Sequence, residues 1–176
     1  MKNLCKIVIY GSLPFIIPTA SYALGPLTPT VSANAVFITP LAATVNNNAS
    51  FGYLKAATGG TYVLSTADVV TASAGGVTIG GTPLAASLSI TGSGTQLIDV
   101  IVTFGAAVSG VTPSLPRCLY GAGSETACDV AMTGLGAPTS GGTTLLIGMK
   151  IVADGVSQPD SATPINIPIP VTISYN

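Results

Sequence analysis

The chain has 176 residues, of which only 6% are charged and none is histidine, and its formal net charge is −1. An average soluble domain carries about 25% charged residues. Five scattered Lys and Arg residues offer no basic surface for nucleic acid or anionic lipid, so neither partner is expected. Without imidazole the chain lacks the commonest catalytic base and metal ligand. We therefore predict a protein that is not an enzyme and uses no cofactor or metal.

The first segment has the layout of a secretory signal peptide. Lys2 and Lys6 precede an apolar run over residues 7–17, and small residues follow up to Ala23. The apolar run is shorter than the about 20 residues that a membrane-spanning helix needs. We expect a signal peptide over 1–23, a single domain over 24–176 and no transmembrane segment after cleavage. The exported chain would lie at the cell surface or outside the cell, or else in the periplasm.

Alternation of apolar and polar residues with a period of two, typical of β-strands, runs through the rest of the chain. Turns rich in Gly, Pro, Ser and Asn separate the alternating segments, and a helical period is hard to find. In chain order the alternation predicts strands near residues 33–37, 51–55, 61–64, 69–73, 77–79, 86–91, 98–104, 128–133, 145–152 and 165–176. About eight to ten short strands of this kind predict an all-β fold, an antiparallel β-sandwich in preference to a barrel.

Two cysteines, Cys118 and Cys128, remain once the signal segment is removed. An even pair in an exported chain favours a disulfide, which would close the short loop between them and stabilise the fold by roughly 2–3 kcal/mol. Glu125 and Asp129 lie close together in the sequence beside this loop. Two such carboxylates suit a glycosidase pair or a weak calcium site. We interpret them instead as solvated loop residues.

The last twelve residues, 165–176, have a large apolar side chain at every odd position and a polar residue or proline at every even one. In a strand this pattern places all the apolar side chains on one buried face. From residue 167 on, the members of that face are Ile167, Ile169, Val171, Ile173 and Tyr175. Pro168 and Pro170 lack an N–H group and so remove two donors from one edge of the strand. A further strand would pair well only beyond Pro170, or along the other edge.

Three parts of the sequence carry a resemblance to a known family. They are the alternating segment that ends in Pro40-Leu41, the segments 48–54 and 59–65 with their aromatic-Gly and Gly-Thr motifs, and the closing strand 169–176. In these parts the chain resembles the bacterial exported proteins grouped as domain of unknown function 4402. Its layout is similar to that of the spore-coat-U-like pilin subunits of chaperone–usher pili. The resemblance spans most of residues 33–176 and implies a pilin-like, immunoglobulin-type sandwich that a strand from a neighbouring copy completes.

The resemblance also implies a function. The chain would be an exported, non-enzymatic structural protein, a fimbria- or pilus-like subunit of the cell surface that assembles by strand complementation. Its partners would be copies of itself and a periplasmic chaperone, and the closing strand would contact them. Two features depart from the family: the inferred disulfide, and Pro26 and Pro29, which make residues 24–31 a poor donor strand. The alternative is a self-contained secreted or periplasmic binding module, with the loop between the cysteines as its recognition surface.

Overall fold

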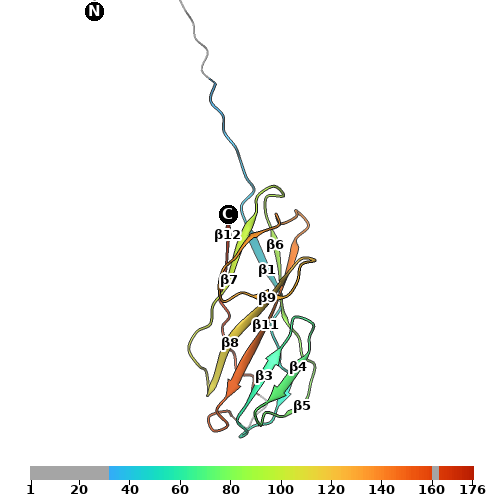
Figure 1. Cartoon of the computed structure of the whole chain (residues 1–176), viewed down its shortest axis with the longest axis vertical. Helices are drawn as coiled ribbons and strands as arrows, with labels where there is room; N and C mark the ends of the chain where they lie inside the picture. Colours follow the sequence, from blue (N-terminus) through green and yellow to red (C-terminus); the bar gives the residue numbers. More distant parts are fainter. Residues whose placement is uncertain (1–31, 160–162) are drawn as a thin grey trace, which may run out of the picture. The chain divides into compact units, whose positions relative to one another are not determined.

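The computed structural model of the protein describes residues 32–159 and 163–176. The chain divides into two units: Met1–Ala35, of which residues 32–35 are described, and the compact unit Val36–Asn176 (Figure 1). The predicted signal segment, residues 1–23, lies outside the described residues. The described residues contain no helix, and therefore none that is long and apolar enough to cross a membrane.

The compact unit is all-β, as the alternation predicts, and its strands pair antiparallel throughout the described residues. This matches the turn-rich sequence, because glycines and prolines interrupt helices but are common in the turns that join short strands. The strands are β1 Ala42–Asn47, β2 Tyr53–Leu54, β3 Gly60–Leu64, β4 Val70–Ser73, β5 Thr78–Gly80, β6 Ala86–Thr91, β7 Ile98–Val102, β8 Val111–Tyr120, β9 Thr126–Ala127, β10 Met132–Leu135, β11 Thr143–Ala153 and β12 Val171–Tyr175.

The strand count exceeds the expected eight to ten, and the differences have local causes. The strand predicted over 33–37 is wrong, because residues 32–40 have no regular secondary structure and the first strand begins at Ala42. Strand β8 escaped prediction because Pro113 and Pro116 interrupt its alternation and Leu115 adopts a positive φ of 45° at a β-bulge. Strands β2 and β9 have only two residues each, too few for a periodic pattern to stand out.

Strand β11 organises the larger sheet. One of its edges pairs with β6 along Thr143–Ile147 and with β3 along Met149–Ala153, and its other edge pairs with β8. Strands β1, β4 and β9 then flank β6, β3 and β8 respectively. The smaller sheet has the order β10-β7-β12, and β2 pairs with β5 separately. Together the sheets form a sandwich-like fold.

The core lies between the two sheets. Strand β7 sends Ile98, Val100 and Val102 inward, and each of these side chains is at most 1% exposed. They belong to one buried cluster with side chains of β6 and β11, among them Leu145 and Ile147. The period of two that predicted these strands therefore also identified their buried faces.

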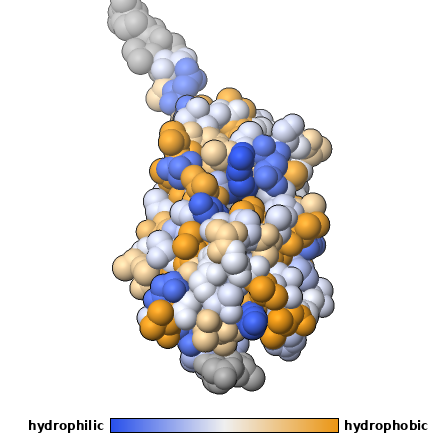
Figure 2. All heavy atoms as spheres, turned by 60° about the horizontal axis from the view of Figure 1, so that its bottom comes forward, coloured by the Kyte–Doolittle hydropathy of each residue, from blue (hydrophilic) through white to orange (hydrophobic). Residues whose placement is uncertain are grey.

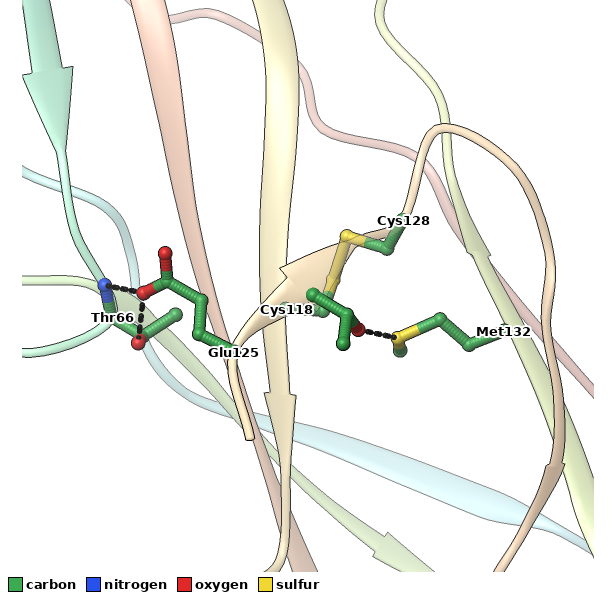
Figure 3. Close-up of a disulfide and its surroundings, with 6 residues drawn as sticks. Thr66, Cys118, Glu125, Cys128 and Met132 are labelled. Carbon is green, nitrogen blue, oxygen red and sulfur yellow. Dashed lines mark hydrogen bonds between the residues drawn. A yellow bond between two sulfur atoms is a disulfide. The ribbon is translucent and has the colours of Figure 1, made fainter. Parts of the chain in front are cut away.

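One side of the sandwich is closed by the loop that carries the disulfide (Figure 3). The Cys128 N–H donates to the Pro116 carbonyl of β8 at 3.2 Å, and the Cys128 carbonyl accepts from the Val102 N–H of β7 at 2.8 Å. The predicted Cys118–Cys128 bond is confirmed, and both cysteines are fully buried. Because β8 belongs to one sheet and β7 to the other, Cys128 joins the two sheets along this side.

Candidate functional site

The opposite side of the sandwich, along the closing strand, is open. Strand β12 is the last strand of the order β10-β7-β12, so within the described part of the chain only one of its edges is paired with another strand. Its inward side chains Val171, Ile173 and Tyr175 pack against the core cluster, yet all three stay half-exposed. Ile167 and Ile169 continue the same face and are also half-exposed. Strand β7, by contrast, is paired on both edges and buries its inward side chains completely.

Strand β12 is shorter than the predicted segment 165–176, and the prolines give the reason. The pairing of β12 with β7 runs from Val171↔Val102 to Tyr175↔Ile98. The Pro170 carbonyl accepts a bond from the Thr103 N–H at 3.0 Å, but Pro170 itself has no N–H to return. The hydrogen-bonded pairing with β7 therefore ends at Pro170, and residues 165–170 form no strand.

The same hydrogen bonds show which edge of β12 the prolines occupy. In an antiparallel pair, every second residue exchanges its backbone bonds with the neighbouring strand. Pro170 and Asn176 bond to the residues that flank β7, Pro170 to Thr103 and Asn176 by donating to the Leu97 carbonyl at 3.0 Å, so the even positions face β7. The N–H and C=O groups of Val171 and Ile173 consequently face the unpaired edge. Of the two alternatives that the sequence left open, the second holds: the free edge keeps its donors.

A groove of about 440 Å³ lies beside this free edge. Its lining comes from β1, β6 and β11 of the larger sheet, from the loop after β1, and from residues 165–171. Ile147 and Leu88 contribute from the sheet, and Val45 of β1, 60% exposed, contributes from the far side. Strand β1 is itself an edge strand with all six residues exposed. The groove is thus the place where one more strand could lie beside β12 and cover the larger sheet.

A wider hollow of about 750 Å³ adjoins the groove. The two share four apolar lining residues, Ala49, Phe51, Ile165 and Ile167. The wider hollow also reaches side chains of β2, β3 and β5, the strands at the end of the compact unit opposite the end of β12 (Figure 1). The closing segment therefore borders the groove up to Val171, and at Ile165 and Ile167 it borders the wider hollow as well.

At the other end of β12 the space is filled. The Tyr175 hydroxyl accepts a bond from the Ser93 N–H at 2.7 Å and donates to the Thr39 carbonyl. A Cβ atom placed on Gly92 would lie 2.7 Å from the Tyr175 hydroxyl oxygen and 2.9 Å from the Leu41 side chain. Glycine at 92 is therefore needed for this close approach of the two side chains.

The groove offers no chemistry of its own. All described residues that line it are uncharged, and among the described residues Lys55 is the one charged residue that lines the wider hollow. The described residues contain no group of His, Cys, Asp or Glu side chains that could hold a metal ion. Its apolar walls and unpaired backbone edge suit an extended peptide, which supplies apolar side chains and backbone hydrogen bonds together.

The shifted carboxylates lie outside the groove and serve the loops. Glu125 accepts bonds from the backbone N–H and the hydroxyl of Thr66, and the hydroxyl bond is the first cause of its lowered pKa (Figure 3). Asp154 accepts bonds from the N–H groups of Ser157 and Val156, which lower its pKa. Glu125 thus ties the disulfide loop to the turn after β3. Glu125 and Asp129 are both exposed, as expected for solvated loop residues, but the sequence did not predict the contact with Thr66.

The segment before β1 presents unpartnered apolar residues. All residues from 32 to 40 are exposed, Phe37 by 94% and Val36 by 86%. Among the hydrogen bonds between described residues, this segment takes part only in the one from Tyr175 to the Thr39 carbonyl. Its alternation, with Ala33, Ala35 and Phe37 on one face, is nevertheless that of a strand.

The sequence identified the residues of the closing strand but not the groove. The alternation showed the apolar face of the closing strand and the positions of the two prolines. The floor of the groove, however, is formed by β6 and β11, and their alternation is that of any core strand. Comparison of the chain with protein-family models, with curated proteins and with solved structures gave no match. The resemblance to exported pilin-like proteins stays a prediction.

Proposed function

We propose that this protein is an exported, non-enzymatic structural subunit that assembles into a surface filament by strand complementation. The observation that carries the proposal is the groove beside β12, where an unpaired strand edge borders a half-exposed apolar face. An extended segment in this groove would pair with the free edge and cover Ile167, Ile169 and Val171. An incomplete sandwich with a vacant strand position is the requirement for this mode of assembly.

The occupant we propose is the segment around Ala33–Phe37 of a second copy. Its odd positions are apolar, and five extended residues span about 17 Å, the same as Ile167–Val171. Phe37 would bring the largest apolar side chain, and Val36 would point away from the core. Pro26 and Pro29 lie before this stretch, so they leave its backbone donors intact. The alternative, a self-contained binding module, has in its favour that β12 does pair within the chain, but that pairing uses only one edge.

A matched pair of variants tests this assignment. Phe37→Ser and Val36→Ser change neighbouring residues that are almost equally exposed in the single chain, so neither should alter its free energy of unfolding. Burial of a Phe side chain contributes about 1.5–3 kcal/mol, which corresponds to roughly 10- to 150-fold in an association constant. Chains that begin at Leu24 would be examined by size exclusion and negative-stain microscopy. We expect polymers from the unmodified chain and from Val36→Ser, and mainly monomers from Phe37→Ser.

Deletion of residues 24–38 should abolish polymers, and a synthetic peptide of residues 31–40 should then bind the shortened chain and raise its melting temperature. A chain that remains a cooperative monomer with and without residues 24–38, at all concentrations, would contradict strand exchange. It would favour the binding module instead.

A further inference from the structure

The distribution of space along the groove determines which way a bound segment runs. The segment carries small side chains at Ala33 and Ala35 and a large one at Phe37. Ile165 and Ile167 border both the groove and the wider hollow, whereas at the Tyr175 end the side chains of Tyr175 and Leu41 pack closely against Gly92. Phe37 therefore fits near Ile165 and Ile167, with Ala33 toward Val171. Since residue numbers then increase in opposite directions, the bound segment runs antiparallel to β12.

The tether between this segment and its own folded body is short. Only residues 38–41 separate Phe37 from Ala42, where β1 begins, and this distance spans at most about 18 Å when fully extended. The reach of this tether is shorter still, because the Tyr175 hydroxyl holds the Thr39 carbonyl against the compact unit of the same copy. A copy that places Phe37 near Ile165 must therefore bring its folded body against the end of the receiving copy where the wider hollow opens.

That end exposes apolar side chains whose burial the single chain does not provide. Tyr53 of β2 is 66% exposed and Ile79 of β5 is 64% exposed, and both line the wider hollow. Val77, just before β5, is 40% exposed. Figure 2, which turns the lower end of Figure 1 forward, shows hydrophobic residues on the surface among polar ones.

We infer that the surface formed by Tyr53, Val77 and Ile79 at the β2–β5 end is a second contact between copies, which receives the Tyr175 end of the copy whose segment occupies the groove. This inference rests on the proposed function and adds to it a polarity and a body-to-body interface. Each junction in the filament would then have two parts, the inserted segment and this surface.

Site-directed cross-linking tests the polarity. One copy, comprising residues 24–176, carries Ile38→Cys. A second copy of the same length with a different tag carries either Tyr53→Cys or Thr95→Cys. Thr95 is an exposed residue beside Ser93 at the Tyr175 end, so it serves as the matched control. The native cysteines are buried in their disulfide and stay outside the reaction. After mixed polymerisation and treatment with a short bis-maleimide, we expect several-fold more mixed dimer from Tyr53→Cys than from Thr95→Cys.

More product from Thr95→Cys would overturn the inference by reversing the polarity, and polymers that yield equal or no product would overturn the interface. A second measurement uses Tyr53→Ser combined with Ile79→Ser, which should still bind the peptide of residues 31–40 but form several-fold shorter polymers. Unchanged polymer length would also refute the interface. Failure of the proposed function looks different: neither peptide binding nor polymers would then be seen in any variant.

Discussion

Replacing Cys118 and Cys128 together by alanine tests how the closed side of the sandwich is held. The two residues lie 10 positions apart, and the chain-entropy relation for a loop of that length gives about 2.7 kcal/mol at 25 °C. Both side chains are fully buried, so the lost sulfur atoms leave a cavity that adds to the cost. We therefore expect the free energy of unfolding to fall by about 3 kcal/mol, a large part of a typical domain's stability.

Urea unfolding of the purified chain, followed by far-ultraviolet circular dichroism, measures this change. The intact protein in strong reductant serves as the control, because it should approach the stability of the double variant, while the variant itself should not respond to reductant. A loss below about 1 kcal/mol would refute the reasoning. It would mean that the backbone bonds of Cys128 to Pro116 and Val102 hold the two sheets without help from the disulfide.

Two further predictions concern the open side and the loops. Ile173→Asp places a charge on the inward, half-exposed face of β12 and should cost about 1–3 kcal/mol in chemical unfolding, whereas Thr172→Asp, on the outward face, should stay within about 0.5 kcal/mol; equal effects would mean that the buried face is wrongly assigned. The hydrogen bond from Thr66 lowers the pKa of the Glu125 carboxyl below its ordinary value of 4.5. The contact therefore stabilises the fold at a pH above 4.5, and this contribution is lost as the pH falls through the lower pKa of the folded state. Glu125→Gln should therefore flatten the acid side of the stability profile, and a parallel profile would contradict the contact.

The sequence predicts those strands in which buried and exposed side chains alternate without interruption. Strands β6, β7, β11 and the closing strand have continuous alternation, and in each of them the apolar side chains of the alternation face the core. Strand β8 was missed because its prolines and the positive φ of Leu115 interrupt the period. Local pattern indicates that a segment can form a strand, but whether it finds a partner depends on the tertiary fold.

Residues 33–37 illustrate that difference. Their alternation is as regular as that of several true strands, and yet they form no strand and lie exposed. The compact unit pairs its described strands without them, and β12 lies at the edge of its sheet beside the groove. The function that we propose rests on these two features, the segment that could form a strand and the sheet edge that could accept one. Neither could be recognised before the pairing of the other strands was known.

The unpaired edge of β12 also lacks the features with which proteins usually prevent association. Exposed edges are commonly protected by lysine, by proline or by inward-pointing charges. No residue from 165 to 176 is charged, and neither is any residue of β1 across the groove. Pro168 and Pro170 would protect an edge, but they lie on the side of β7, where they shorten an internal ladder instead. An edge without such protection is prone to pair with any extended chain, unless a specific partner covers it. The strand complementation that we propose would supply such a partner. It would also account for the position of the two prolines, which leaves every outward donor of β12 available for pairing.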